Sequence, residues 1–276
     1  MSTETTVERH YTHGSLEAAI REALGAAGKD LTKLAPADLA PVDEFHIGGR
    51  QATKHFAETL GVTPGLTLLD IGCGIGGASR FFASEYGATV TGVDLTEEYI
   101  AVAEAMSGWV GLADRVSYRQ ASGLELPFPD GAFDIACLLH VGMNIADKTR
   151  LFAEAARVVK PGGRFGVFDV MRIGEGPLAF PVPWAADEVT SFLASPADYR
   201  GAMEAAGLSV LAENARRDFA LAFFNEVRAR VGQDGPPPLG LHILMGEDAA
   251  LKFANMTRNI EDGLIAPVEM VGEKKG

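Results

Sequence analysis

The segment LLDIGCGIGG, residues 68–77, joins a short apolar run to a glycine-rich turn. The run begins at Leu66 and is typical of a strand that is buried on both faces of a sheet. Residues 77–86 then show helical spacing of their apolar side chains, so the glycines lie where a strand passes into a helix. In open α/β folds this position is the carboxyl edge of the sheet, where ligands bind.

Strands and helices are predicted to alternate from this turn to residue 171. The expected strands cover residues 66–71, 89–94, 116–119, 133–139 and 164–171, and the expected helices cover residues 77–86, 96–108 and 147–159. A helix over residues 197–206 and strands over 208–213 and 268–271 resume the pattern. Such alternation predicts an α/β fold with a Rossmann-like, doubly wound sheet of seven strands. We expect the sheet to be mostly parallel, with one antiparallel strand among the last.

Additional segments are predicted on both sides of this alternation. Helices are expected over residues 16–24 and 50–60, with a break between them at Pro36 and Pro41. Two further helices, over residues 219–231 and 247–261, are separated by a proline run. We therefore predict an N-terminal helical lid over residues 1–62 and a core over 63–276, with cap insertions at about 172–195 and 214–262.

The composition excludes several classes of partner. The chain has 24 Lys and Arg against 37 Asp and Glu, and the resulting net charge of −13 disfavours nucleic acid and anionic membrane surfaces. No apolar run approaches the roughly 18–20 residues that span a bilayer, and the polar N-terminus lacks the layout of a signal peptide. The two cysteines do not form a disulfide framework, so we expect a cytoplasmic protein, for which a homodimer is an allowed assembly.

The glycine turn and two aspartates indicate which nucleotide binds. Gly72, Gly74 and Gly77 match the dinucleotide pattern G-x-G-x-x-G, and Asp94 lies 20 residues after Gly74, where it can accept both ribose hydroxyls of an adenosine. Asp70, however, stands just before the turn, and its carboxylate would repel a pyrophosphate. It favours a ligand with an ammonium and a sulfonium, which indicates S-adenosylmethionine rather than NAD.

Four segments in order carry a resemblance to a known family. They are LLDIGCGIGG (68–77), VTGVDLT (90–96), LELPFPDGAFD (124–134) and ARVVKPGGRF (156–165), and they resemble the successive motifs of class I S-adenosylmethionine-dependent methyltransferases. The flanking segments DEFHIGGRQAT (43–53), HVGMNIADK (140–148), FPVPWA (180–185) and GLHILMG (240–246) resemble the sarcosine/dimethylglycine N-methyltransferase-like branch, which has a methyltransferase type 11 domain. The resemblance implies an enzyme that converts S-adenosylmethionine to S-adenosylhomocysteine.

The resemblance also implies roles for individual cofactor-site residues. The backbone around Gly72, Cys73 and Gly74 approaches the methionine and ribose, and Asp70 anchors the ammonium. Asp94 holds the ribose hydroxyls. The remaining implied contacts are Leu95 against the adenine, Ser122 and Gly123 at the adenine edge, and His140 as a wall of the site. Many relatives have an aspartate where this chain has Ser122, which makes the contact to the adenine amino group a neutral hydrogen bond.

The acceptor side is expected to involve the N-terminal segment and the segments that follow the fourth and fifth strands. Tyr11 and His140 are the predicted catalytic residues, since either could receive the acceptor's proton through water. The predicted substrate-binding residues are Phe45, Arg50, Met143, Asn144 and Trp184. Arg50 would hold an anion, and Trp184 would form part of an aromatic wall for a methylated ammonium.

We therefore predict methyl transfer to a small-molecule acceptor, most simply an amine such as sarcosine or dimethylglycine. The alternative is C- or O-methylation of a quinone, lipid or phosphobase. A dehydrogenase on the same fold and a non-catalytic S-adenosylmethionine-binding protein are further alternatives. No metal is expected, because the six histidines show no metal-ligand spacing.

Overall fold

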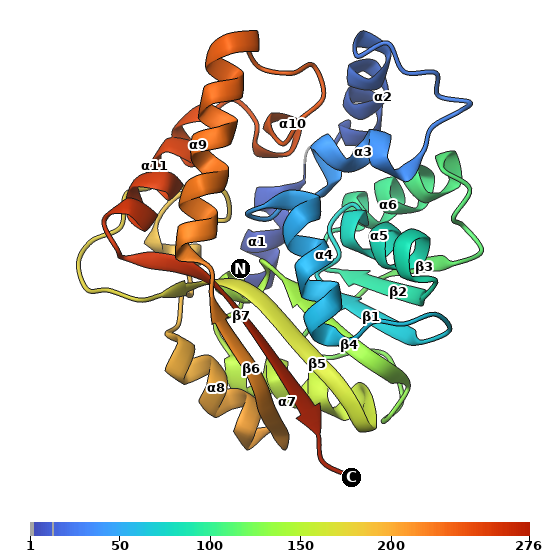
Figure 1. The fold of residues 1–276 in the computed structure, drawn as a ribbon, viewed down its shortest axis with the longest axis vertical. Coiled ribbons are helices and arrows are strands. Elements are labelled where there is room, and N and C mark those ends of the chain that lie inside the picture. Colours follow the sequence, from blue (N-terminus) through green and yellow to red (C-terminus); the bar gives the residue numbers. More distant parts are fainter. Residues whose placement is uncertain (1–2, 13) are drawn as a thin grey trace.

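A computed structural model describes residues 3–12 and 14–276 and shows a seven-stranded sheet between layers of helices (Figure 1). The strand order is β3-β2-β1-β4-β5-β7-β6. The strands are β1 (Thr67–Ile71), β2 (Thr89–Asp94), β3 (Val116–Gln120), β4 (Phe133–Leu139), β5 (Val159–Arg172), β6 (Leu208–Ala215) and β7 (Ile265–Lys274). Strand β7 runs antiparallel to its two neighbours, β5 and β6, and the other neighbouring strands pair in parallel. The predicted fold class is confirmed.

Helices cover both faces of the sheet and its carboxyl edge (Figure 1). The helices are α1 (Thr3–Tyr11), α2 (Leu16–Ala26), α3 (Pro36–Asp43), α4 (Gly49–Leu60), α5 (Gly77–Tyr86), α6 (Glu97–Trp109), α7 (Lys148–Val158), α8 (Pro196–Ala205), α9 (Arg217–Asp234), α10 (His242–Met245) and α11 (Ala249–Glu261). Phe56 of α4 and Phe82 of α5 pack on one face, and Phe152 of α7 and Tyr199 of α8 pack on the other. None of the described helices is both long and apolar enough to cross a bilayer.

The N- and C-terminal additions pack together above the carboxyl edge. Leu16 and Leu39, from α2 and α3, share an apolar cluster with Leu244 of α10. A second cluster joins Trp184, which precedes α8, to Phe224 of α9 and to Met256 of α11. These segments are far apart in the sequence, and together they cover the end of the sheet where the glycine turn lies.

Two local predictions were wrong. The segment around Pro36 forms α3 instead of a break, because a proline at the first helical position loses no hydrogen bond and the Asp38 carboxylate accepts the Ala35 N–H at 2.9 Å. Strand β5 begins at Val159 rather than Arg164. Its register against β4 shifts between Phe133 and Ile135, so the proline–glycine run lies inside the strand as a bulge.

Candidate active site

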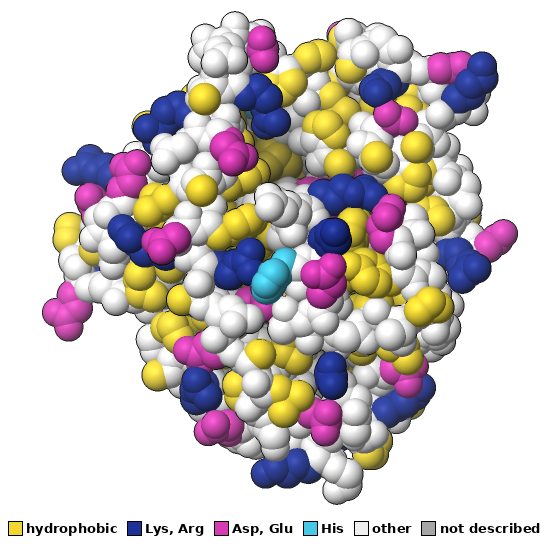
Figure 2. Space-filling view, viewed as in Figure 1, with side chains coloured by type: hydrophobic (Ala, Val, Ile, Leu, Met, Phe, Trp, Pro, Cys, Tyr) yellow, Lys and Arg dark blue, Asp and Glu magenta, His cyan; other side chains and the backbone are white. Residues whose placement is uncertain are grey.

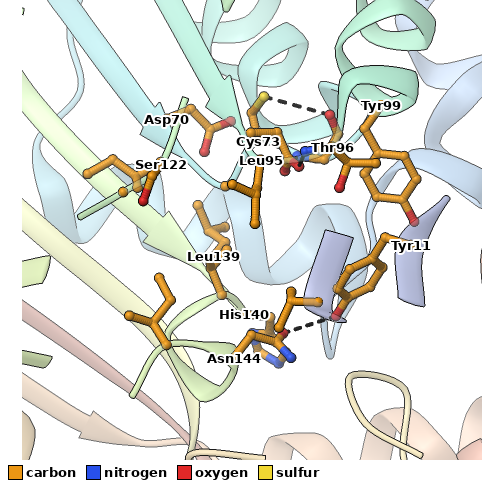
Figure 3. A pocket seen from close by; sticks show the side chains of 18 of the residues that line it. Tyr11, Asp70, Cys73, Leu95, Thr96, Tyr99, Ser122, Leu139, His140 and Asn144 are labelled. Carbon is orange, nitrogen blue, oxygen red and sulfur yellow. Dashed lines mark hydrogen bonds between the residues drawn. The ribbon is translucent and has the colours of Figure 1, made fainter. Parts of the chain in front are cut away.

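A cavity of about 310 Å³ lies at the carboxyl edge of the sheet, beside the glycine turn. Strands β1, β2 and β4 end at its wall, and α1 closes one side. All the predicted cofactor-site residues line it, namely Asp70, Gly72, Cys73, Gly74, Asp94, Leu95, Ser122, Gly123 and His140. Of the predicted acceptor-side residues, Tyr11, Phe45 and Asn144 line it as well. The topology therefore brings together residues from both ends of the predicted site (Figure 3).

The glycines of the turn occupy conformations that other residues rarely adopt. Gly72 has φ +73°, and a Cβ there would lie 2.3 Å from a methyl carbon of Val141. Gly74 has φ +54°, and no atom lies within 4 Å of the place where its Cβ would be. Gly72 thus lets β1 and the segment after β4 approach each other, and the Gly74 backbone borders open space that a ligand can enter.

Asp70 is a buried carboxylate that faces the cavity. It is 1% exposed, and its Oδ2 atom accepts a hydrogen bond from the Ser79 hydroxyl at 2.6 Å. Burial raises the pKa of Asp70 to about 6, although the hydrogen bond from Ser79 opposes this shift. A cationic group in the cavity would stabilise the ionised form and lower this pKa again.

Asp94 ends β2 and is oriented by backbone donors. Its two carboxylate oxygens accept the Gly74 and Thr96 N–H groups, each at 2.9 Å. Burial raises the pKa of Asp94, while these hydrogen bonds oppose the rise. Each oxygen keeps a second lone pair, so the carboxylate can still accept hydroxyl groups from a ligand.

At the predicted adenine edge, Ser122 already has a partner. Its hydroxyl donates to the Glu4 carboxylate of α1 and accepts the Leu124 N–H at 3.0 Å. Gly123 lines the same part of the cavity. A ring bound there meets the backbone of residues 122–123, unless the contact between Ser122 and Glu4 opens.

His140 has both ring nitrogens engaged. Nε2 accepts the Ile47 N–H at 3.3 Å, which places the ring proton on Nδ1, from which it is donated to the Phe168 carbonyl at 3.1 Å. Burial lowers the pKa of His140 to about 3, and the neighbouring His46 contributes to the shift. The residue also has φ +54°, unusual for a side chain with a Cβ. These contacts favour a neutral wall over a proton acceptor.

Tyr11 projects from the end of α1 toward the segment that follows β4 (Figure 3). Its hydroxyl donates to Asn144 Oδ1 at 3.0 Å, and Asn144 Nδ2 donates to the Trp184 carbonyl at 2.9 Å. Burial, followed by the charges of Asp94 and Asp169, raises the pKa of Tyr11 well above its usual value. Tyr11 therefore stays protonated and acts as a hydrogen-bond donor, not as a base.

The Tyr11→Phe variant is expected to reduce methyl-transfer turnover by about tenfold with little change in cofactor affinity. The reason is that the hydrogen bond from Tyr11 to Asn144, on the predicted acceptor side, is lost. Steady-state rates and calorimetry on the same preparation measure the two effects. Tyr86→Phe is the matched control, since the Tyr86 hydroxyl contacts only the Lys54 carbonyl. Equal turnover in the wild-type chain and Tyr11→Phe would rule out a role for this hydroxyl.

A second, smaller cavity of about 50 Å³ adjoins the first. The two share Tyr11, Phe45, His46 and His140 in their walls. The predicted substrate residues Met143 and Trp184 line the second cavity and are 4% and 2% exposed. The Trp184 indole N–H donates to the Ser191 hydroxyl at 3.0 Å, which fixes the ring in the wall.

Arg50 lines neither of these cavities. It lies on α4 and its guanidinium contacts the Glu85 carboxylate at 2.7 Å and the Phe81 ring at 4.7 Å to the ring centre. The side chain thus points toward α5, and the geometry gives no support to the predicted anion-holding role.

Tyr99 was not among the predicted site residues, and His46 was predicted only as a candidate of the N-terminal lid, with no assigned role. His46 lines both cavities, and its Nε2 lies 2.9 Å from the Thr53 hydroxyl, which donates to Glu44 Oε2 at 2.7 Å. Tyr99 lines the first cavity, and its buried hydroxyl has no hydrogen-bond partner among residues 3–12 and 14–276. The signals for these two residues in the sequence are local. His46 stands in the DEFHIGG segment, residues 43–49, and Tyr99 follows β2 closely.

Residues 69–167 match the family model described as a methyltransferase domain. These residues form a methyltransferase domain. The match begins in β1 and ends in β5, so the domain contains the glycine turn, Asp94 and the strand that leads to His140. The resemblance predicted from the motifs is confirmed for this segment.

Several curated relatives of this chain are named as methyltransferases, and most of these names give different acceptors. Methyltransferase GfsG of Streptomyces halstedii is 33% identical over 134 residues, which are 49% of this chain and 48% of that protein. Other curated relatives are named as sterol 24-C-, tocopherol O- and phosphoethanolamine N-methyltransferases. The chain spans about half or less of the length of the first curated relatives it matches, from 48% down to 27%.

Two solved structures share the fold of the methyltransferase domain together with its flanking segments. Phosphoethanolamine N-methyltransferase 2 of Haemonchus contortus, in complex with S-adenosyl-L-methionine, is 21% identical with a TM-score of 0.77, and the similarity covers 100% of this chain and 60% of that one. A protein named as a sarcosine dimethylglycine methyltransferase from Galdieria sulphuraria is 20% identical with a TM-score of 0.67, covering 94% and 98%.

Proposed function

We propose that this protein is an S-adenosylmethionine-dependent methyltransferase that acts on a small-molecule acceptor. The negative charge of the first cavity supports this proposal independently of the family match. Five carboxylates line it, those of Glu4, Asp43, Asp70, Asp94 and Asp147, and no Lys or Arg does so among the described residues. The Asp43 carboxylate is paired with Arg80, which leaves four carboxylates without a basic partner in the part of the wall that the structure describes. Such a cavity suits a ligand with an ammonium and a sulfonium and repels the pyrophosphate of a dinucleotide. The dehydrogenase alternative is disfavoured on the same ground.

The residues present fit the cofactor. Asp70 offers a carboxylate for the ammonium, Asp94 offers acceptors for the ribose hydroxyls, and the open side of Gly74 admits the ligand to the backbone. The Tyr99 hydroxyl, buried in the wall without a partner, can hydrogen-bond to a ligand. The bound cofactor supplies a methyl group already activated by its sulfonium.

Alignment and exclusion of water are the tasks left to the chain's own residues. Tyr11 donates a hydrogen bond from α1, and His140 supplies a neutral, fixed wall. For an amine acceptor, burial in the apolar second cavity would favour the unprotonated, nucleophilic form. This chemistry requires no charged base, which agrees with the protonation states of Tyr11 and His140.

We further propose that residues 1–62 act as a lid and that the segments 172–195 and 214–262 cap the acceptor side of the core. Four residues of α1 line the first cavity, and Trp184, Phe224 and Met256 of the later segments line the second. Helix α1 of this lid would have to move for the cofactor to enter, since Glu4 and Tyr11 both contact the domain across the cavity.

The acceptor atom stays open within this proposal. The similarity to the Galdieria sulphuraria protein agrees with an amine such as sarcosine or dimethylglycine. The curated relatives, however, are named for methylation at carbon and oxygen as well as nitrogen, so C- or O-methylation of a quinone, lipid or phosphobase is retained as the alternative. A homodimer, a cytoplasmic location and independence from nucleic acid and metal remain predictions.

Calorimetric titration with S-adenosylhomocysteine and with NAD tests the proposed cofactor. We expect saturable binding of S-adenosylhomocysteine and none of NAD. Formation of S-adenosylhomocysteine from S-adenosylmethionine, followed over a panel of amines, quinols and phosphobases, then tests catalysis. Binding of NAD alone would overturn the proposal, and cofactor binding with no turnover on any acceptor would favour the non-catalytic alternative.

A further inference from the structure

The second cavity is almost entirely apolar and aromatic. Apart from the residues it shares with the first cavity, the side chains that dominate its wall are Met143, Trp184, Phe223, Phe224, Phe253 and Met256. Figure 2 shows a hollow lined by hydrophobic side chains, between the α9–α10 region and the α2–α3 region as they are placed in Figure 1. Aromatic rings and thioethers of this kind pack against apolar and aromatic ligands.

Positive charge is absent from this wall. None of the described residues that line either cavity is a Lys or Arg. Three cations of the surrounding helices have partners elsewhere: Arg50 contacts Glu85, Arg80 contacts Asp43, and Lys252 of α11 donates to the Met245 carbonyl. A carboxylate or phosphate in the second cavity would lose its water and gain no counter-ion, which is strongly unfavourable.

Its polar groups lie where the two cavities meet, and they are neutral. Tyr11 keeps its proton, as described above, and the His140 ring accepts from the Ile47 N–H and donates to Phe168. His46 has its Nε2 within reach of the Gly49 carbonyl and the Thr53 hydroxyl, and burial lowers its pKa to about 4. The Tyr11 oxygen can still accept a hydrogen bond from one uncharged polar group at the junction, and the wall offers apolar packing beyond it.

We propose that the methyl acceptor is an uncharged, largely apolar molecule that carries no carboxylate or phosphate. Its reacting polar group lies between Tyr11 and His46, and its hydrocarbon or aromatic part packs in the second cavity. In methyl transfer the acceptor atom would bond to the methyl carbon as that carbon's bond to the sulfonium sulfur breaks, and the proton displaced from the acceptor would pass to solvent water. This inference rests on the proposed function and narrows it: sarcosine, dimethylglycine and phosphobases are selected against, and neutral aromatic or hydrocarbon acceptors are selected for.

A matched pair of probes tests the inference in the full chain. The first step is to saturate the protein with S-adenosylhomocysteine, whose binding is measured on its own. The chain is then titrated with 4-methylcatechol and with 3,4-dihydroxybenzoate, which differ by a methyl group in place of a carboxylate. We expect the neutral probe to bind at least tenfold more tightly, and sarcosine to bind no better than the benzoate. Equal affinities, tighter binding of the anion, or no binding of the neutral probe would overturn the inference.

A positively charged side chain placed in the wall of the second cavity provides a second test of the inference. Phe253 is partly buried in α11 and lines the second cavity, so Phe253→Lys should reverse the preference toward 3,4-dihydroxybenzoate. Leu251→Lys is the control, because Leu251 lies on the same helix and is 50% exposed; it should leave the preference unchanged. An unchanged preference in a folded Phe253→Lys chain would place the probes elsewhere and overturn the inference. Failure to bind S-adenosylhomocysteine would instead count against the proposed function.

Discussion

Replacing Asp43 with alanine is expected to lower the free energy of unfolding by about 3–5 kcal/mol. Asp43 Oδ2 contacts Arg80 Nη2 at 2.7 Å, and the two side chains are only 4% and 1% exposed. Without the carboxylate, the guanidinium would remain buried with only the weaker contacts to Ser107 and the Ala103 carbonyl, at 3.3 and 3.4 Å. Because this ion pair joins α3 to α5, its loss also loosens the helices that flank the glycine turn.

Urea denaturation of Asp43→Ala beside Glu85→Ala measures this effect. Glu85 pairs with Arg50 at the same 2.7 Å, but these side chains are 49% and 30% exposed. Exposed pairs contribute about 0–1 kcal/mol, so the control should change stability little. Similar losses of unfolding free energy in the two variants would show that burial of the Asp43–Arg80 pair does not add to its contribution to stability.

Asp94→Ala is expected to weaken S-adenosylhomocysteine binding by at least tenfold, or about 1.4 kcal/mol. The substitution removes the proposed acceptor of the ribose hydroxyls. It also removes the acceptor for the Gly74 and Thr96 N–H groups, both 2.9 Å away. The turn is then held to β2 only by the hydrogen bonds from the Gly72 and Cys73 N–H groups to the Val93 carbonyl. Both effects act on the same ligand, which is why the expected loss is a lower bound.

Calorimetry on folded variants measures this affinity, with Asp114→Ala as the control. Asp114 is an exposed carboxylate between α6 and β3, so its removal changes the net charge equally without touching the cavity. Asp94→Asn separates the two contributions, since its amide oxygen still accepts a hydrogen bond while the charge is lost. Unchanged affinity in Asp94→Ala would remove Asp94 from the cofactor site.

The sheet and the cofactor side were predictable because their signals are local. Buried parallel strands require apolar runs, and a close approach such as that of Gly72 to Val141 requires glycine. The turn and Asp94 therefore appear in the sequence as a contiguous pattern with a fixed spacing. Helix α3 was missed because both prolines were read as breakers, whereas Pro36 stands at the first helical position and Pro41 lies inside the helix near its end.

The acceptor side depends on contacts between distant segments, which spacing does not encode. His46 becomes a site residue only because the segment before α4 meets the residue that follows β4, where the Ile47 N–H donates to His140. The importance of Tyr99 lies in a hydroxyl that no described neighbour satisfies. Arg50 shows the opposite case: it was predicted to hold an anion as part of the N-terminal lid, but its guanidinium lies against Glu85.

Tyr11, Phe45, His46 and His140 belong to the walls of both cavities, and this has a thermodynamic consequence. A ligand in either cavity restricts the motion of side chains that the other ligand also contacts, so the ordering entropy is lost only once. Occupancy of one cavity should therefore change the affinity of the other, and by linkage the change is the same in both directions. Cofactor and acceptor are then cooperative ligands, and an affinity measured for one alone understates how strongly the pair is held.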